Sequence, residues 1–149
     1  KSDKAFKRVR RLDLAGMYGY NPTTGRFQND VLGFSFWATL PSLEKGFLAD
    51  LNDSFNLEAG LFSEWKWSPM GASHDLIFMP AMGGRWNFHL THKWTLYSAA
   101  RVGLEFTKIG LRPHGAGALG ALWQLKPHMS LKAELNTRHF LNVGVSFPY

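Results

Sequence analysis

Apolar residues alternate with small or polar residues along most of the chain, and the pattern is clearest in residues 141–149. One row of this segment is apolar and aromatic: Leu141, Val143, Val145, Phe147 and Tyr149. The other row is small or polar: Asn142, Gly144 and Ser146. Successive side chains of a β-strand point to opposite faces, so the pattern predicts a strand with one continuous apolar face.

The same alternation predicts eight strands in all, separated by segments with turn residues such as Gly, Pro and Asn. They are expected at residues 11–20, 31–40, 54–67, 75–88, 94–106, 115–125, 129–136 and 141–149. Residues 107–114 are expected to form a loop, and residues 42–46 a helical turn within the longer connection 41–53. Short connections between consecutive strands favour an antiparallel, up-and-down order.

Strand length favours a membrane setting. Strands of soluble sheets usually have about 5–6 residues, whereas a tilted strand that crosses a membrane needs roughly 9–11 residues, as most of these do. No apolar run approaches the roughly 18 residues of a membrane helix. A membrane protein with this sequence is therefore a barrel, and the predicted fold class is all-β, an eight-stranded antiparallel up-and-down transmembrane β-barrel.

The less apolar strand faces combine many Gly and Ala residues with a few charges of both signs. Small residues suit the crowded interior of an eight-stranded barrel, and opposite charges can pair there. We therefore expect these faces to line the lumen, with the apolar faces against lipid. The predicted polar network of the lumen consists of Asp13, Glu58, Glu64, Lys66, Arg85, Arg101, Glu105, Lys132 and Glu134.

Aromatic residues on the apolar faces gather near the strand ends, and because strand direction alternates they sort to two opposite rims. Tyr18, Tyr20, Trp65 and Trp67 are expected at one rim. Trp86, Trp94, Trp123, Phe147 and Tyr149 are expected at the other. Two such girdles are typical of the two membrane–water interfaces, where an aromatic ring contacts lipid while its polar atom reaches water.

Composition narrows the setting further. The 149 residues include no cysteine, which fits an oxidising envelope compartment and excludes disulfides. The net charge is +6, and much of it lies in residues 1–10, a basic arm that precedes a single barrel domain, 11–149. The arm could bind nucleic acid, although no nucleic-acid-binding motif follows it, and phosphate groups of lipid head-groups are an equally good electrostatic partner. A solvated tail without a partner is the third interpretation of the arm. The chain begins without a signal peptide, so the barrel interpretation expects the signal to have been removed.

Two stretches resemble known outer-membrane proteins. Residues 120–125 and 130–135, GALWQL and SLKAEL, resemble the penultimate hairpin of small eight-stranded bacterial barrels. The last strand is similar to the C-terminal strand that the barrel-assembly machinery recognises, although Pro148 departs from that pattern. From about Leu12 the chain is similar to this class, which includes the transmembrane domain of outer-membrane protein A. The resemblance implies periplasmic termini, with the loops at 21–30, 68–75, 107–114 and 137–140 outside.

The resemblance implies a bacterial outer-membrane location, with outer-membrane lipid and lipopolysaccharide around the barrel. It implies a structural or binding role, a lumen filled by side chains and no wide, porin-like pore. The assembly machinery and a periplasmic or membrane protein are the expected partners. We expect no cofactor, no metal site and no nucleic acid.

Two other functions stay open. Lipid-modifying enzymes, of the lipid A deacylase or acyltransferase type, share this size. Residues 133–139, the stretch nearest to their late catalytic strand, contain no His-x-Ser, and no catalytic residue is assigned. Pro80, within a predicted strand, removes one ladder hydrogen bond, and two interpretations stay open: a tolerated bulge, or a lateral gate for lipid like that of outer-membrane palmitoyl transferases, which the chain resembles in size and class. A soluble, lipocalin-like barrel is the second alternative, because Gly84-Arg85-Trp86 is similar to the lipocalin Gly-x-Trp motif.

Overall fold

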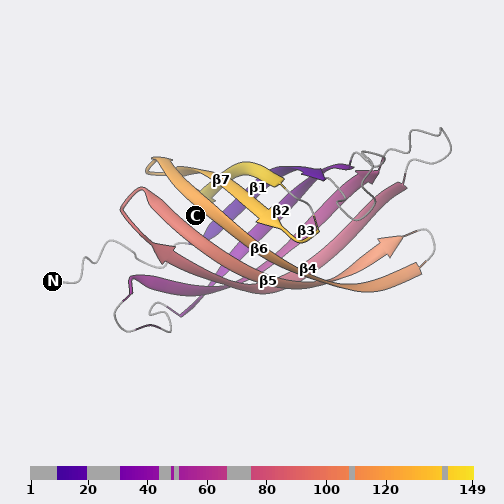
Figure 1. Cartoon of the computed structure of the whole chain (residues 1–149), viewed down its shortest axis with the longest axis horizontal. Coiled ribbons are helices and arrows are strands. Elements are labelled where there is room, and N and C mark those ends of the chain that lie inside the picture. Colours follow the sequence, from indigo (N-terminus) through magenta and orange to yellow (C-terminus); the bar gives the residue numbers. More distant parts are fainter. Residues whose placement is uncertain are drawn as a thin grey trace.

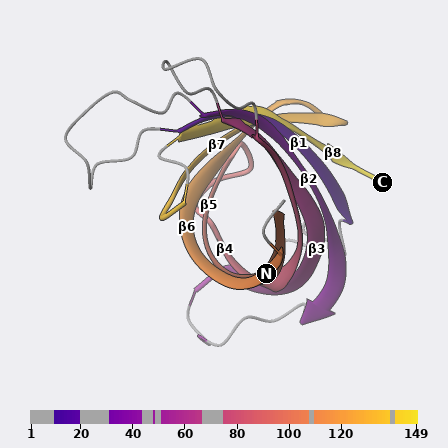
Figure 2. The same ribbon diagram turned by 90° about the vertical axis from the view of Figure 1, so that its right-hand side faces the viewer.

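The computed structural model describes residues 10–19, 31–43, 48, 51–66, 75–107, 110–138 and 141–149. These residues form eight strands that close into one antiparallel barrel in chain order, with β1 paired to β8. The strands are β1 Arg11–Gly19, β2 Val31–Leu43, β3 Asp53–Lys66, β4 Asp75–His89, β5 Trp94–Thr107, β6 Gly110–Lys126, β7 Met129–Asn136 and β8 Leu141–Pro148. Figure 1 shows the strands from the side, and Figure 2 looks along the barrel.

The predicted fold class is confirmed, and two predicted connections are wrong. Residues 110–114 belong to β6 and pair with β5, so they are not part of a loop. Pro113 and the glycines suggested a turn, but Pro is accepted where a strand is paired on one side only, and β6 pairs with β7 only from Ala118 onward. Likewise, β2 continues to Leu43, which excludes a helical turn at residues 42–43. The rest of that predicted turn lies outside the described residues.

The barrel has two ends that differ in their connections. At the terminal end, the Tyr149 amide donates a hydrogen bond of 2.9 Å to the carbonyl of Arg10. Residues 90–93 between β4 and β5 and residues 127–128 between β6 and β7 also lie at this end. At the distal end, β5 and β6 continue well past the end of β7 (Figure 1). The barrel wall is therefore taller on the β5–β6 side than on the β7–β8 side.

Alternation in the sequence becomes an inside and an outside in the barrel. Along β8, Asn142 and Ser146 are buried while Leu141 and Val143 are exposed. The same order holds in β5, where Tyr97 and Arg101 are buried and Leu96 and Val102 are exposed. The structure therefore places the polar row in the lumen and the apolar row on the outer surface.

Glycines make room for two aromatic rings inside the narrow lumen. A Cβ atom added at Gly120 of β6 would overlap the ring of Tyr97, its partner across the β5–β6 ladder. A Cβ atom at Gly60 of β3 would lie 2.6 Å from the indole of Trp37 on β2. Each large ring thus lies over a glycine, which has no side chain. The rings therefore fill the interior without requiring a wider barrel.

Candidate functional site: a charged lumen inside an apolar wall

A cluster of ion pairs crosses the middle of the lumen. Arg85 on β4 donates to Asp13 on β1, with 2.7 Å between Nη1 and Oδ2. Lys132 on β7 approaches the same Asp13 oxygen to 3.2 Å. One carboxylate therefore bridges cations from two other strands.

Arg101 on β5 connects this cluster to two further carboxylates. Its Nε lies 2.6 Å from Glu58 Oε1, and its Nη1 and Nη2 lie 2.6 and 2.9 Å from the two oxygens of Glu134. The Tyr97 hydroxyl donates to the same Glu134 at 2.7 Å. The forked arrangement of Arg101 on Glu134 is the geometry in which a guanidinium binds a carboxylate most strongly.

Aromatic rings cover the cations of this cluster. The guanidinium of Arg85 lies 3.9 Å from the centre of the Tyr97 ring, and that of Arg101 lies 4.3 Å from the centre of the Trp37 ring. Both arrangements are cation–π contacts, which are strongest where water is excluded. Trp37 also meets Phe62 edge to face, with ring centres 4.9 Å apart, beside Met17 and Met79.

The central cluster is balanced in charge. It joins three carboxylates to three cations, and all six side chains are buried: Asp13, Glu58, Glu134, Arg85, Arg101 and Lys132. Removing ions from water is costly, and only close partners and additional hydrogen bonds offset that cost. The arrangement is therefore suited to closing the lumen with paired charges.

A second, smaller group lies toward the distal end. Arg138, which follows β7, contacts Glu64 of β3 through Nε and Glu105 of β5 through Nη1, the latter at 2.9 Å. Arg138 was not among the predicted lumen residues, because a residue in a predicted connection gives no periodic signal. Its side chain thus connects the segment after β7 to two strands that are not adjacent in the barrel, β3 and β5.

The nine predicted lumen residues thus separate into three groups. Six form the central cluster, and Glu64 and Glu105 meet through Arg138. Lys66 belongs to β3, but its side chain lies outside the described part of the structure. Sequence reasoning did not assign Tyr97 to the network, although its place on the inward row of β5 was the available signal.

The predicted rim aromatics lie on the outer surface wherever their side chains are described. Trp65 is exposed near the distal end of β3. At the terminal end, Trp94 and Trp123 stack across the β5–β6 ladder with ring centres 5.8 Å apart. The other described members at that end are Trp86, Phe147 and Tyr149. The side chain of Tyr18 and all of Tyr20 and Trp67 lie outside the described residues.

Pro80 points outward from β4 at a break in the ladder. β4 pairs with β5 at Phe78 and again from Ala81 onward, whereas Pro80 keeps its partner Leu61 on β3. The missing amide donor of proline accounts for the break on one side.

A chain of hydroxyl and imidazole groups lies at the terminal mouth. Ser54 Oγ is 3.1 Å from His89 Nε2, and His89 Nδ1 is 3.1 Å from Thr95 Oγ1. Asn87 also donates to Ser54 Oγ at 3.4 Å. Sequence reasoning missed this group, because its members come from three different strands and share no short motif.

Comparison with known proteins agrees on the architecture. No protein-family model and no curated protein matches the sequence. Among solved structures, a de novo designed transmembrane β-barrel aligns over 96% of this chain and 98% of its own, with a TM-score of 0.60 and 13% identity.

Two structures of Ail from Yersinia pestis give the same result. The structure in a phospholipid bilayer nanodisc covers 95% of this chain and 99% of its own, with a TM-score of 0.54 and 10% identity. The complex with the heparin analogue sucrose octasulfate covers 95% and 99%, with a TM-score of 0.52 and 11% identity. The chain therefore has the fold of an eight-stranded transmembrane β-barrel.

Proposed function

We propose that this chain is a small barrel of the bacterial outer membrane that acts by binding rather than by conduction. The proposal rests on the distribution of polar and apolar side chains, which is the reverse of that in a soluble protein. Paired charges such as Arg101 and Glu134 are buried inside, and large apolar residues such as Leu119 and Met82 are exposed outside. Hydrocarbon is the solvent for which such a surface is stable.

The extent of the outer apolar surface supports a lipid setting. Soluble monomers rarely expose contiguous apolar patches larger than a few hundred Å². Here exposed apolar side chains occur on every strand of the closed wall, for example Leu14, Phe36, Leu57, Phe78, Leu104, Leu125, Leu131 and Val143. A soluble, lipocalin-like barrel has the opposite arrangement, with an apolar interior and a polar exterior. We therefore prefer the membrane over the soluble alternative.

The aromatic residues at the two ends are proposed as the interface girdles. Trp94, Trp123 and Tyr149 then mark the periplasmic interface, and Trp65 marks the outer one. Indole and phenol groups favour this depth, since the ring contacts hydrocarbon while the polar atom meets water. Trp86 lies near the same end, where its Nε1 donates to the carboxylate of Asp53 at 2.6 Å.

The lumen is proposed to be a plug. Its charges are already paired, and the rings of Trp37 and Phe62 occupy the space beside them. In eight-stranded barrels the interior is just wide enough for side chains. The described packing supports a role at the ends of the barrel or at its outer surface, and argues against wide, porin-like transport.

Anionic partners fit the charge of the chain. The net charge is +6, and phosphate groups of lipopolysaccharide are the nearest anions in an outer membrane. Ail was solved with a sulfated heparin analogue. We propose that the present barrel likewise recognises anionic groups, that residues 1–10 extend into the periplasm toward a protein partner, and that β8 is the segment the assembly machinery reads.

Electrophoresis of detergent-refolded protein, unboiled against boiled, tests the proposal. A closed barrel stays compact in the detergent, so the unboiled band is expected to run faster and to shift on heating. A protein that shows no shift and stays monodisperse without detergent would contradict the membrane placement.

The hydroxyl–imidazole chain supports a second candidate function, an acyl hydrolase. A Ser hydroxyl next to a His whose other nitrogen is hydrogen-bonded is the arrangement of an activated nucleophile. Ser54 would be the nucleophile, His89 the base and Thr95 the group that orients the base. Covalent labelling of refolded protein by a fluorophosphonate tests it. Labelling that is lost in Ser54→Ala and kept in Ser63→Ala favours the enzyme, and no labelling of the folded protein excludes this nucleophile.

A further inference from the structure

Two turns at the terminal end lie next to each other and carry four basic residues. His92 and Lys93 belong to the turn between β4 and β5, Lys126 ends β6, and His128 lies in the turn that follows, all of them exposed. The Gln124 amide donates to the Lys93 carbonyl at 2.8 Å, which joins the two turns (Figure 1). The four basic residues therefore occupy one part of the rim, which we call the rim patch.

The charges of the rim patch have no partner within the described chain. None of its four side chains belongs to an ion pair among the described residues. No Asp or Glu occurs in residues 88–94 or 122–131. Asp53, an acid at the same end, is only 5% exposed and accepts a hydrogen bond from Trp86. The two lysine charges are thus available to an anion from outside the chain.

Two stacked tryptophan rings lie beside the rim patch on the outer wall. Trp94 directly follows Lys93, and Trp123 lies three residues before Lys126. Both rings are exposed, at 45% and 40%, with their centres 5.8 Å apart. Indole rings favour the membrane–water interface, and lysine stems reach from that depth toward water. In the proposed membrane placement, the two ammonium groups therefore lie at the level of the lipid phosphates.

Both turns are held in place by contacts of their own. The amides of Lys93 and Trp94 donate to Thr91 Oγ1 at 3.2 and 3.1 Å, and the Leu90 amide donates to the Trp94 carbonyl at 3.0 Å. Across the second turn, Lys126 pairs with Met129. The backbone that carries each lysine is thus ordered before a ligand arrives, which reduces the entropic cost of binding.

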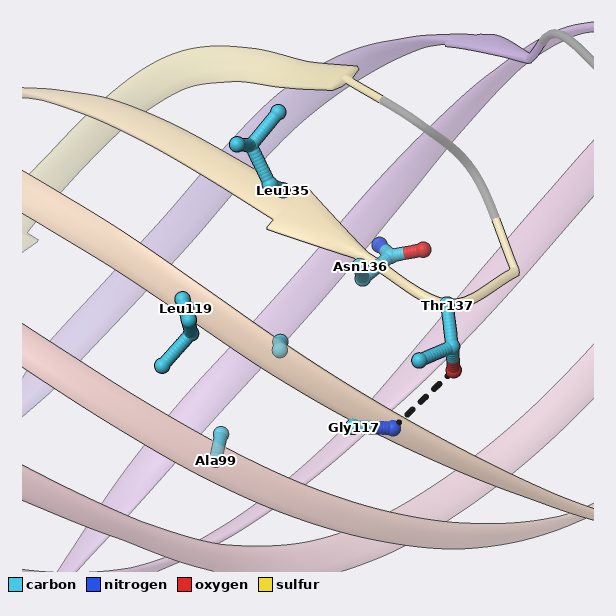
Figure 3. Close-up of a pocket in the computed structure, with 7 residues that line it drawn as sticks. Ala99, Gly117, Leu119, Leu135, Asn136 and Thr137 are labelled. Carbon is cyan, nitrogen blue, oxygen red and sulfur yellow. Dashed lines mark hydrogen bonds between the residues drawn. The ribbon is translucent and has the colours of Figure 1, made fainter.

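A shallow hollow of the outer surface, near the end of β7, offers an anion no comparable contact. Figure 3 shows the residues that line it, and none of them has a charged side chain. The Gly117 amide at this hollow is already engaged, since it donates to Thr137 Oγ1 at 3.1 Å. A negatively charged head-group is therefore favoured at the rim patch over this part of the wall.

We propose that the rim patch binds the head-group of a phospholipid with net negative charge, such as phosphatidylglycerol, in the leaflet at the terminal end. Lys93 and Lys126 supply the positive charge, and imidazole N–H groups of the two histidines donate to phosphate oxygens. The tryptophan pair contacts the upper part of the acyl chains. The proposal rests on the membrane placement in the proposed function, and it gives the recognition of anions a lipid class and a place.

A fluorescent label close to the rim patch tests the proposal. Because the chain has no cysteine, Leu125→Cys, exposed between Trp123 and Lys126, accepts a single nitrobenzoxadiazole label. The protein is refolded in phosphatidylcholine vesicles with equal small fractions of nitroxide-labelled phosphatidylglycerol or nitroxide-labelled phosphatidylcholine. Quenching should be stronger with phosphatidylglycerol, and this preference should fall at high salt, which screens exposed charges. Leu40→Cys, exposed toward the same end of β2, is the control site and should show no preference.

Charge-removing variants separate the rim patch from the net charge of the chain. Lys93→Gln and Lys126→Gln should each lower the preference at residue 125 by roughly fivefold, the usual effect of one lysine near an anionic surface. Arg10→Gln removes one exposed charge at the same end but outside the patch, and should leave the preference unchanged. An equal loss in all three variants would overturn the patch. The heat-dependent band shift of each variant should remain, which verifies that the barrel closes.

Failure of the rim patch and failure of the membrane placement give different results. Equal quenching by the two lipids at residue 125 would overturn the patch and leave the membrane placement intact. Absence of quenching by either lipid at residues 125 and 40 would overturn both. A preference for phosphatidylglycerol of the same size at both residues would also overturn the patch, because the attraction would then belong to the whole end of the barrel.

Discussion

At the scale of single residues, the chemistry of the lumen depends on Arg101. Its guanidinium joins Glu58 to Glu134 and lies against the Trp37 ring. Without this residue two buried carboxylates would lose their closest cation. Removing one partner of a buried ion pair costs more stability than the intact pair contributes, because the remaining charge is left uncompensated where water is excluded.

Arg101→Met should therefore destabilise the barrel by about 3–5 kcal/mol, the usual cost of breaking a buried pair by removing one partner. Urea unfolding of vesicle-embedded protein measures the change. Arg112→Met is the matched control, since Arg112 is exposed on the neighbouring strand, and exposed substitutions usually change stability by less than about 0.5 kcal/mol. Equal, small effects of both variants would show that the central ion pairs are accessible to water.

At the scale of elements, β4 and β6 differ in how they accommodate proline. Pro80 lies in β4 between two neighbouring strands, and it interrupts the β4–β5 ladder. Pro113 lies in the part of β6 that pairs with β5 but lies beyond the β6–β7 ladder. A proline in a strand that is paired on both sides weakens the wall more than a proline in a segment paired on one side only. The first strand needs both of its hydrogen-bonded ladders for the barrel to close.

Amide exchange near Pro80 should consequently be faster than elsewhere in mid-strand, as the gate hypothesis requires. Pro80→Val restores one donor and should slow exchange at Ala81 and Gly103 by up to about tenfold, corresponding to the roughly 0.5–1.5 kcal/mol of one hydrogen bond. Pro113→Val should leave these amides unchanged. Slow exchange on both sides of Pro80 in the wild-type protein would remove the gate from consideration.

At the scale of the whole molecule, the barrel combines a closed ring of strands with a filled interior. The central cluster brings together residues from β1, β3, β4, β5 and β7. Arg138 adds contacts to β3 and β5 near the distal end. Cross-lumen pairs of this kind hold opposite walls together, so the strands cannot move apart independently.

Planar-bilayer recordings should accordingly show no stable, porin-like conductance for the wild-type barrel. Trp37→Ala is the change most suited to increase any leak, because this fully buried ring lies between Arg101 and Phe62. Leu96→Ala on the outer wall is the control and should behave as wild type. Large, steady conductance of the wild-type protein would contradict a plugged lumen.

Local pattern by itself determined the strands and their faces. Period-two alternation depends only on the extended backbone, which is why β7 at Met129–Asn136 and the inward row of β5 followed directly from the residues. It also showed which charges share an interior. It failed at residues 110–114, where Pro113 and glycine signals outweighed an alternation that the pairing with β5 sustains.

Only the tertiary structure decided which side chains meet. Asp13 and Lys132 are far apart in the chain and become neighbours because β1 and β7 both flank β8 in the closed ring. Where the strands end relative to one another likewise decides that Arg138 reaches the lumen and that Ser54 meets His89. Alternation sets the face of each residue, but the register and closure of the barrel set its height and its partners.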